Sequence, residues 1–402
     1  APPRSEGSGA SMAARAAFLL LLAAPAVAFV RPSGAARPST TLNMAAEDPL
    51  LLRAARGEEV ERVPVWMMRQ AGRHMQIYRD LCKTHKTFRD RSEDADVATE
   101  ISMQPYNAYK TDGVILFSDI LTPLPGMGVD FDILEKQGPK IVPVRTAEQV
   151  AKMHLMDPAK DCPFVGQALK NLRGLVGNDA TVLGFVGLPY TLATYLVEGG
   201  SSKDYKEIKK LMYQDPSTLH SMLTVLADNV ADYASYQIES GAQVIQVFDS
   251  WAADLAPADY DVFSGPYQKR VVEAIKARHP EVPVIMYINK SGALLERMAA
   301  TGVDIISLDW TVTIKEARER VGNSIGLQGN LDPMLLFAPD SVIKERTEDM
   351  LRQGGGRRHV ANLGHGIDMN TSEEKAKFFI DTVKNFRFHD APATEDAAAA
   401  AA

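Results

Sequence analysis

The chain has 402 residues, of which 46% are hydrophobic and 24% charged, as expected for a globular protein with one large domain or two average ones. Its net charge is −7, and residues 1–44 contribute +3, so the remainder carries −10. This balance argues against nucleic acid as a partner, because phosphate binding needs a basic face. The two cysteines are far apart and the eight histidines show no HxxxH or HExxH spacing, so we expect neither a disulfide framework nor a metal site.

Residues 1–44 have the composition of a leader. After a first methionine at Met12, residues 12–28 combine a cationic start, a short apolar core and small residues, which is typical of a secretory signal peptide and too short for a membrane span. Residues 29–44 are rich in Arg, Ser, Thr and Pro and contain no acid, as transit peptides do. This order, with Phe29 first, resembles the bipartite leaders of plastids with extra membranes. We therefore expect a location in the plastid (chloroplast) stroma; a secreted enzyme is the alternative.

From residue 45 onward, short apolar strands alternate with amphipathic helices. The expected strands span 63–67, 113–117, 181–186, 243–248, 282–288, 303–308, 324–328 and 359–363. The expected helices span 93–110, 161–177, 206–240, 257–278, 291–301, 312–321, 341–352 and 371–387. Eight such repeats predict an α/β fold: a single-domain (β/α)8 TIM barrel over residues 45–388 with its cleft at the C-terminal ends of the strands. A doubly wound open sheet is the alternative, although no GxGxxG follows the first strand. The Ala-rich tail, 389–402, is expected to be disordered.

The first strand ends in an unusual run, PVWMMRQAGR at 64–73. Two cations, Arg69 and Arg73, flank Gln70, Ala71 and a glycine directly after buried apolar residues. Arginine offers a fork of donors that matches a carboxylate, and glycine lets the backbone approach a ligand closely. The run is therefore a candidate anion-binding loop, although surface salt bridges are the commoner use of arginine.

The other strand ends carry further polar groups, which a barrel would bring to the same cleft. In chain order they are Phe117-Ser118-Asp119, Gly187 to Thr191 with Tyr195 and Glu198 beyond, Phe248-Asp249-Ser250-Trp251, Asn289-Lys290, Asp309-Trp310, Gln328-Gly329-Asn330 and Gly364-His365-Gly366.

Several of these residues also have a structural interpretation. Asp119 could cap the following helix, as Asp after a strand often does. Asp249 and Asp309 are expected to be structural, and Tyr195 at a helical position could belong to the core. Two flanking glycines expose the ring of His365, which favours a functional role.

The motifs together resemble those of the uroporphyrinogen decarboxylase family. The run at 64–73 and GFVGLPYTLATYLVEGG at 184–200 look like its two signature segments. Shorter matches follow in the family's order: LFSDIL (116–121), VFDSWA (247–252), SLDWT (307–311), LQGNLDP (327–333) and NLGHGI (362–367). The resemblance covers roughly residues 50–388.

The resemblance implies a barrel that works as a homodimer with no metal or organic cofactor. Its substrate would be uroporphyrinogen III, whose four acetates lose CO2 to give coproporphyrinogen III on the route to haem and chlorophyll. The substrate-binding residues implied are Arg69, Gln70, Ala71, Arg73, Phe117, Asp119, Tyr195, Ser250 and His365, and the catalytic ones among them are Asp119, Arg69, Tyr195 and His365.

These residues suit the chemistry physically. Arg69 and Arg73 would bind acidic side chains of the substrate, and the Asp119 carboxylate would stabilise a protonated pyrrole. Arg69 is the family's usual candidate for the acid, whereas His365 is the easier proton donor by pKa. The chain departs from the family after the first motif: an arginine that some members carry aligns with Cys82, and Arg79 lies nearby.

Two other functions remain open from the sequence. Cobalamin-dependent methyltransferases share this barrel but bind zinc through His and Cys at strand ends, and such a ligand set is missing at Phe248 to Trp251. A non-catalytic porphyrinogen-binding protein is the second alternative, and the combination of charged residues above argues against it.

Overall fold

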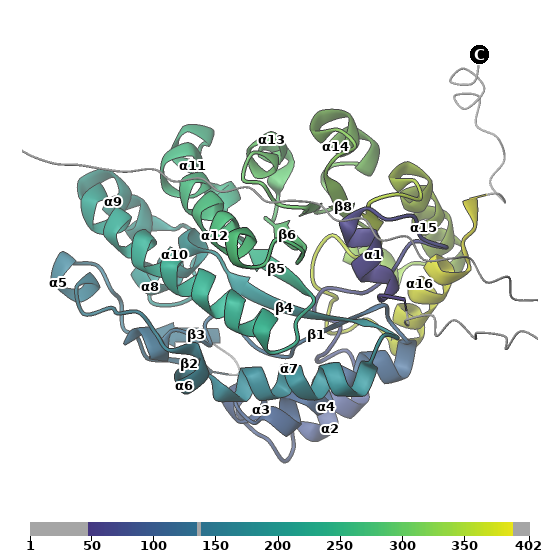
Figure 1. Cartoon of the computed structure of the whole chain (residues 1–402), viewed down its shortest axis with the longest axis horizontal. Helices are drawn as coiled ribbons and strands as arrows, with labels where there is room; N and C mark the ends of the chain where they lie inside the picture. The colour runs from purple at the N-terminus through teal and green to yellow at the C-terminus, as the bar shows by residue number, and fades with distance from the viewer. Residues whose placement is uncertain (1–46, 135–137, 389–402) are drawn as a thin grey trace, which may run out of the picture. The chain divides into compact units, whose positions relative to one another are not determined.

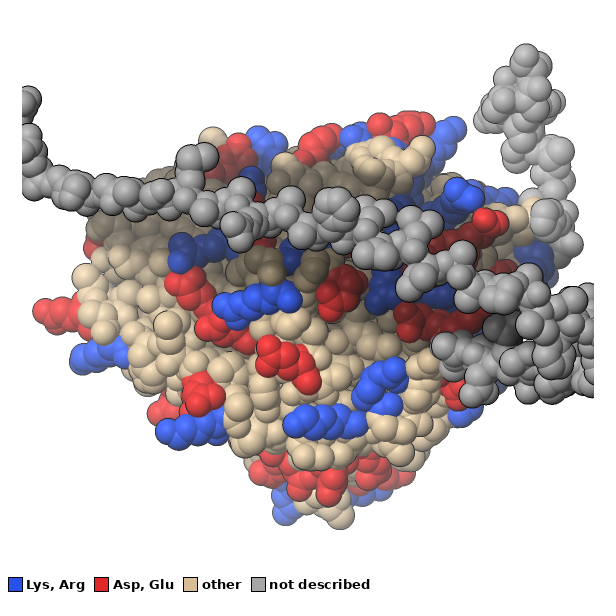
Figure 2. Space-filling model, in the orientation of Figure 1, with Lys and Arg blue, Asp and Glu red and all other residues tan. Residues whose placement is uncertain are grey.

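The computed structural model of the chain describes residues 47–134 and 138–388. The predicted leader, residues 1–44, and the predicted disordered tail, residues 389–402, lie outside the described residues. Within the described part, parallel strands lie in the interior and helices cover them (Figure 1). None of the helices in this part of the chain is long and apolar enough to cross a membrane. On the face drawn in Figure 2, basic and acidic side chains lie interspersed, so this face offers no broad patch of one charge.

Seven strands form one parallel sheet whose spatial order follows the sequence. They are β1 (Gly113–Ile115), β4 (Thr181–Gly187), β5 (Val244–Phe248), β6 (Val284–Tyr287), β7 (Ile305–Ser307), β8 (Gly326–Gln328) and β9 (His359–Val360), and each pairs with the next. Most of their residues are buried, as in sheets covered by helices. A doubly wound sheet reverses its strand order midway. This sheet does not, so that alternative is wrong.

The expected first strand, residues 63–67, is reduced to a single parallel pair, Val65 with Ala361. It nevertheless has hydrogen bonds on both sides. The amide of Ala361 donates to Pro64 O at 2.9 Å, and the amide of Asp112 donates to Val65 O at 2.8 Å. Pro64 has no N–H to donate, which explains why the ladder stays short. The segment thus fills the eighth place between β9 and β1 and closes the barrel.

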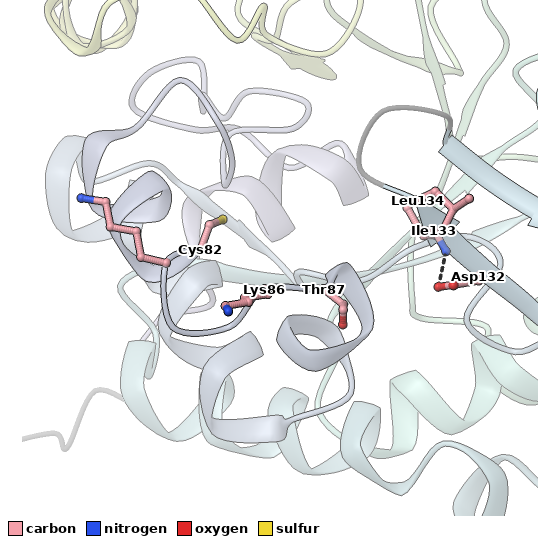
Figure 3. A pocket seen from close by; sticks show the side chains of 7 residues that line it. Cys82, Lys86, Thr87, Asp132, Ile133 and Leu134 are labelled. Atoms are coloured by element: carbon pink, nitrogen blue, oxygen red, sulfur yellow. Dashed lines mark hydrogen bonds between the residues drawn. The ribbon is translucent and has the colours of Figure 1, made fainter.

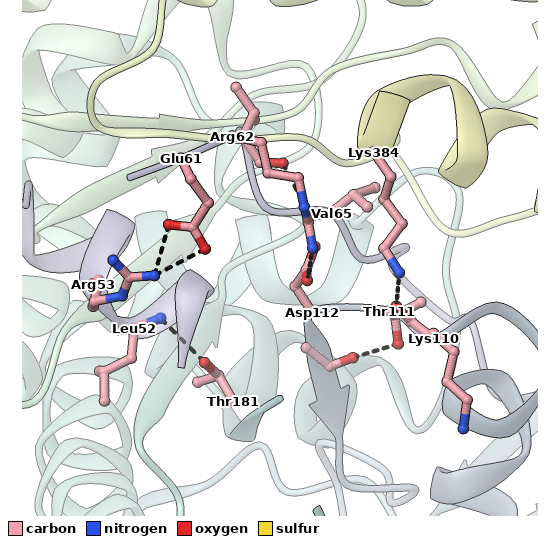
Figure 4. A network of polar contacts seen from close by, with 12 residues as sticks. Leu52, Arg53, Glu61, Arg62, Val65, Lys110, Thr111, Asp112, Thr181 and Lys384 are labelled. Atoms are coloured by element: carbon pink, nitrogen blue, oxygen red, sulfur yellow. Dashed lines mark hydrogen bonds and ion pairs between the residues drawn. The ribbon is translucent and has the colours of Figure 1, made fainter. Parts of the chain in front are cut away.

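A polar network fastens this segment to β1 at the N-terminal side of the sheet (Figure 4). The carboxylate of Asp112 accepts two bonds from Arg62, at 2.6 and 2.7 Å, and one from the amide of Val65 at 2.8 Å. Nearby, the amide of Leu52 donates to Thr181 Oγ1 at 3.1 Å. Since Asp112 directly precedes β1, its bonds hold the short first segment in register with that strand.

An antiparallel hairpin after β1 was not predicted. It comprises β2 (Phe131–Leu134) and β3 (Gly138–Ile141). Its strands are only four residues long and β3 contains Pro139, so they carry little of the alternating apolar pattern by which strands are recognised.

The helices largely follow the predicted ones. The longer helices are α4 (Ala95–Tyr109), α7 (Pro163–Val176), α8 (Pro189–Glu198), α9 (Lys206–Gln214), α10 (Pro216–Glu239), α12 (Gly265–Arg278), α14 (Ile314–Val321), α15 (Asp340–Gly354) and α16 (Glu373–Asn385). The shorter ones are α1 (Leu50–Arg56), α2 (Gln76–Leu81), α3 (Phe88–Ser92), α5 (Ala147–Val150), α6 (Pro158–Asp161), α11 (Pro257–Phe263) and α13 (Leu295–Ala299).

Two predicted helices are each divided in two. The helix expected over 206–240 breaks at Asp215, which caps α10 by accepting from the amide of Thr218, and Pro216 begins the new helix. Proline is favourable at the first position of a helix but not inside one. The helix expected over 257–278 breaks at Ser264, with a proline at the start of α12.

The interior of the barrel contains a polar layer below the strand ends. The Gln328 amide accepts from Trp66 Nε1 at 2.9 Å and donates to Ser307 Oγ at 2.9 Å and Gln246 Oε1 at 3.1 Å. All four side chains are fully buried. Gln328, at the end of the seventh expected strand, therefore belongs to the barrel interior.

Candidate active site

A cleft of about 1610 Å³ lies at the carboxyl ends of the strands. It is lined by eight of the nine substrate-binding residues that the family resemblance implies: Arg69, Ala71, Arg73, Phe117, Asp119, Tyr195, Ser250 and His365. They come from the first segment, β1, the helix after β4, and the ends of β5 and β9, so closure of the barrel brings them together. Ser118, beside Asp119, and Asn289 and Trp310 at two other strand ends line the same cleft.

The ninth residue, Gln70, lies outside the lining. Its side chain is fully buried, accepts from the amide of Met67 at 3.1 Å and donates to Gly113 O at 2.9 Å. The side chain therefore connects the loop that carries Arg69 and Arg73, here called the arginine loop (residues 69–73), to β1. Because this side chain is buried outside the lining, it does not face the cleft as the sequence suggested.

The loop that carries Arg69 is held by residues after β9. The amide of Met68 donates to Asn362 Oδ1 at 2.8 Å, and Met68 O accepts from the amide of Ile367 at 3.0 Å. Arg69 itself has φ 60°, a left-handed conformation that is uncommon for residues other than glycine. Its side chain packs so closely on Gly366 that a Cβ added there would lie 2.3 Å from Arg69 Cδ. Arg69 and the His365 loop are thus positioned together.

Asp119 both caps a turn and lines the cleft. Its Oδ1 accepts from the amide of Leu121 at 2.9 Å, which caps the turn after β1, and its side chain also lines the cleft. Burial raises the pKa of Asp119, whereas the Leu121 amide and the positive charge of Arg69 oppose the rise. The carboxylate therefore depends on nearby donors and cations for its charge.

Tyr195 stands on α8 with its ring centroid 4.1 Å from that of Trp251. Burial, and after it the charge of Asp119, raises the pKa of Tyr195 to about 12. The phenol is therefore protonated at neutral pH and can donate a hydrogen bond into the cleft.

His365 lies edge-on to two aromatic rings, Tyr287 at 6.2 Å and Trp310 at 6.3 Å between centroids. The Tyr287 hydroxyl donates to Gly364 O at 3.1 Å and so holds the loop. Burial and, next, the charge of Arg69 lower the pKa of His365. Both effects favour the neutral ring, and an anion that offsets the charge of Arg69 would weaken the second of them.

The structural interpretation of the two buried carboxylates is confirmed. Asp249 accepts from Thr191, Ser264 and Gln268, each at 2.7 Å from its side-chain donor. Asp309 accepts from the amides of Ser291 at 3.0 Å and Thr311 at 2.7 Å. Both carboxylates are fully buried and stand outside the cleft lining.

Arg79, on α2, has a structural role towards the loop that precedes this helix. Its guanidinium donates to Arg73 O at 2.7 Å, to His74 O at 2.9 Å and to Gln76 Oε1. It lines the cleft together with Cys82. Its bonds to backbone carbonyls fix the loop that carries Arg73.

Sequence reasoning missed part of one wall. Tyr78, Phe88 and Arg91 line the cleft from the short helices α2 and α3, and the hairpin adds Ile133 and Pro139. None of them follows a parallel strand, so a search of strand ends does not find them. In the described residues no group of three or more His, Cys, Asp or Glu is placed to hold a metal ion.

Comparison with known proteins identifies the family. The model of the family described as uroporphyrinogen decarboxylase (URO-D) matches residues 46–386. The chain belongs to the uroporphyrinogen decarboxylase family. Curated relatives named uroporphyrinogen decarboxylase include one from a strain of Prochlorococcus marinus, 57% identical, and one from a strain of Synechococcus, 58% identical. Each aligns over 338 residues, which are 84% of this chain and 96% of the relative.

Solved structures confirm the barrel architecture. A methyltransferase from Methanosarcina mazei superposes with a TM-score of 0.69 and 22% identity, covering 85% of this chain and 99% of the other. A putative vitamin-B12 independent methionine synthase from Listeria monocytogenes follows with a TM-score of 0.51 and 12% identity, over 82% and 97% of the two chains. At these identities the likeness concerns the fold alone, and the family assignment favours neither the methyltransferase nor the non-catalytic alternative.

Proposed function

We propose that this chain is a decarboxylase that removes CO2 from the four acetate side chains of uroporphyrinogen III and releases coproporphyrinogen III. The observation that carries the proposal is a cleft, in a chain of this family, that is lined by Arg69, Arg73, Asp119, Tyr195 and His365. The two relatives named uroporphyrinogen decarboxylase align over 96% of their own length, which supports a shared reaction.

Local cations explain how a net-acidic protein can bind this substrate. Uroporphyrinogen III carries eight carboxylates on four pyrrole rings. Arg69 and Arg73 are exposed in the cleft, where guanidinium groups can bind carboxylates in the bidentate manner. Ala71, between them in the chain, offers a small side chain at the same wall.

The substrate can serve as its own electron sink. A proton added to a ring carbon makes the pyrrole cationic. The bond from the acetate methylene to the carboxylate then breaks, CO2 leaves, and the electron pair flows into the ring. A second proton adds to the methylene carbon to form a methyl group, and loss of the ring proton restores the pyrrole. Each acetate thus consumes one proton overall, and no external electron acceptor takes part.

The residues of the cleft have distinct parts in this sequence. The Asp119 carboxylate accepts hydrogen bonds from pyrrole N–H groups and stabilises the cationic ring. The protonated Tyr195 hydroxyl donates to the substrate. Arg69 holds the acetate that reacts, because a guanidinium is too weak an acid to be the first choice as donor. Substrate carboxylates raise the pKa of His365 and so prepare it to donate a proton.

The test is anaerobic incubation of the purified protein with uroporphyrinogen III, with products separated by their number of carboxylates. Wild-type protein should form coproporphyrinogen III. Asp119→Asn, which keeps shape but removes charge, should lose at least about 10²-fold in rate. The matched control is Asp94→Asn, because Asp94 caps α4 in a similar turn outside the cleft lining. Near wild-type turnover by Asp119→Asn would disprove the electrostatic role of that carboxylate.

We also propose that residues 1–44 direct the protein to the plastid stroma, with a signal peptide at 12–28 and a transit peptide at 29–44. The composition of residues 1–44 supports this proposal. The family match begins at residue 46, so residues 1–44 lie outside it. A fluorescent protein fused behind residues 1–44 should reach the plastid of an alga with extra plastid membranes, whereas residues 1–28 alone should give secretion. Secretion of the longer fusion would contradict the proposal.

A homodimer is the assembly that the family resemblance favours. Sedimentation of the purified protein should give twice the mass of one chain at micromolar concentration. A monomer at that concentration would contradict it.

A further inference from the structure

Arg91 is a buried cation on the wall of the cleft. It belongs to α3, the residue is 5% exposed, and its guanidinium carbon lies 5.7 Å from the centre of the Tyr78 ring. One terminal nitrogen donates to the carbonyls of His85 at 2.5 Å and Lys86 at 3.1 Å. Its Nε is buried and has no hydrogen-bond partner among the described residues. The cation therefore retains a donor that nothing in the described part of the chain uses.

The neighbouring arginine of the same helix behaves differently. Arg89 donates to both carboxylate oxygens of Glu93 four residues later, so its charge is paired. Among the described residues Arg91 forms no ion pair with a carboxylate. A buried charge without a counterion is unfavourable, and proteins normally pair it. An unpaired buried guanidinium that faces a cleft is therefore suited to an anionic ligand.

Cys82 and Tyr78 border Arg91. Burial raises the pKa of Tyr78 to about 12. The positive charge of Arg91 opposes this rise, whereas Cys82 adds to it, so the three side chains lie within electrostatic reach of one another. Cys82 lines the main cleft and also a smaller cavity of about 670 Å³ with Lys83, Lys86, Thr87 and residues 132–134. Figure 3 shows Cys82, Lys86 and Thr87 opposite the hairpin residues Asp132 to Leu134. Lys83 is paired with Asp80, so its charge is already offset.

We propose that Arg91, with Tyr78 and Cys82, forms a subsite that binds a carboxylate of the tetrapyrrole. The proposal rests on the function given above and extends it, since neither the family match nor the strand-end pattern assigns this residue. Arg91 acts by binding and takes no part in bond breaking. The carboxylate can come from a propionate, which stays on the ring throughout, or from an acetate, which is removed.

A chemical probe tests the subsite without the tetrapyrrole. Iodoacetate carries a carboxylate and iodoacetamide does not, and both alkylate a thiol. The thiol gives its proton to solvent, the sulfur–carbon bond forms, the carbon–iodine bond breaks and iodide leaves. Cys82 is partly exposed, whereas Cys162, the other cysteine, is buried. The rate ratio of iodoacetate to iodoacetamide at Cys82 should exceed that of a free thiol by about tenfold, the effect of one charge-assisted hydrogen bond.

Variants assign this ratio to Arg91. Arg91→Gln should reduce it to the free-thiol value, Arg91→Lys should keep part of it, and Arg89→Gln should leave it unchanged because Arg89 lies outside the lining. A ratio that Arg91→Gln does not alter would overturn the proposal. Thermal melting shows whether each variant is folded; if neither Arg91 variant folds, a wild-type ratio no higher than that of a free thiol would still overturn it.

Binding of tetrapyrroles separates the two sources of carboxylate. If a propionate occupies the subsite, Arg91→Gln should raise the KM for uroporphyrinogen III and the inhibition constant of coproporphyrinogen III by a similar factor of about ten. If an acetate occupies it, only the first of the two should rise. If Arg91→Gln changed neither the KM nor the inhibition constant, the tetrapyrrole would be refuted as the ligand of this subsite. Wild-type protein that fails to convert uroporphyrinogen III would refute the proposed function, whereas the alkylation ratio would still decide on the anion subsite.

Discussion

Replacing Gly366 by alanine tests whether the backbone after His365 sets the position of Arg69. An added Cβ would lie 2.3 Å from Arg69 Cδ and 2.8 Å from its Cγ. Since carbon atoms in contact settle about 3.5–4.0 Å apart, the Arg69 side chain has to move by more than about 1 Å. An error of that size in a catalytic site can cost about 10²-fold in rate. We therefore expect kcat/KM for uroporphyrinogen III to fall about 10²-fold.

The melting temperature of Gly366→Ala should change little, because Arg69 is exposed and can swing into solvent. The assay is anaerobic turnover with products separated by carboxylate number, alongside thermal unfolding followed by circular dichroism. Gly174→Ala is the control: an added Cβ on this glycine of α7 meets nothing within 4 Å, so activity should persist and stability should rise by about 0.5–1 kcal/mol. Near wild-type kcat/KM in Gly366→Ala would refute the reasoning.

Three further outcomes are expected. Tyr195→Phe should lower kcat about 10²-fold. The pH–rate profile below pH 9 should keep its shape, because the raised pKa of about 12 leaves the Tyr195 phenol protonated there. A profile that changes shape would contradict this. Burial lowers the pKa of His74 and of His359 from 6.5 to about 4, so below pH 6.5 the unfolded chain binds protons that the folded chain does not. Stability from these two residues is complete above pH 6.5 and should fall by up to about 1.4 kcal/mol per pH unit for each as the pH drops towards 4; urea unfolding should show a flatter dependence when both are glutamine. Asp112→Ala leaves the partly buried Arg62 without its carboxylate and should cost about 3–5 kcal/mol in the free energy of unfolding, so an unchanged denaturant midpoint would show that the network in Figure 4 does not stabilise the barrel.

The sequence by itself determined the barrel and most of the cleft lining. Short strands that are apolar on both faces, separated by amphipathic helices, form a parallel sheet. The carboxyl ends of parallel strands all lie at the same end of the barrel. Polar residues directly after strands, such as Arg69, Asp119 and His365, were therefore expected to meet. The motifs also pointed to the family, because long runs of residue types in a fixed order identify a family without knowledge of contacts.

Only the tertiary structure decided what each side chain does there. Gln70 looked like a cleft residue, but its amide bonds to Gly113, which is 43 positions away. The pKa of His365 depends on burial and on the charge of Arg69. Both arise only when closure of the barrel brings the two residues together. Arg91 reaches the cleft from a helix of five residues with no strand before it. Periodicity reports local conformation, whereas burial, pairing and electrostatic neighbours arise from contacts between distant segments, and these define the site.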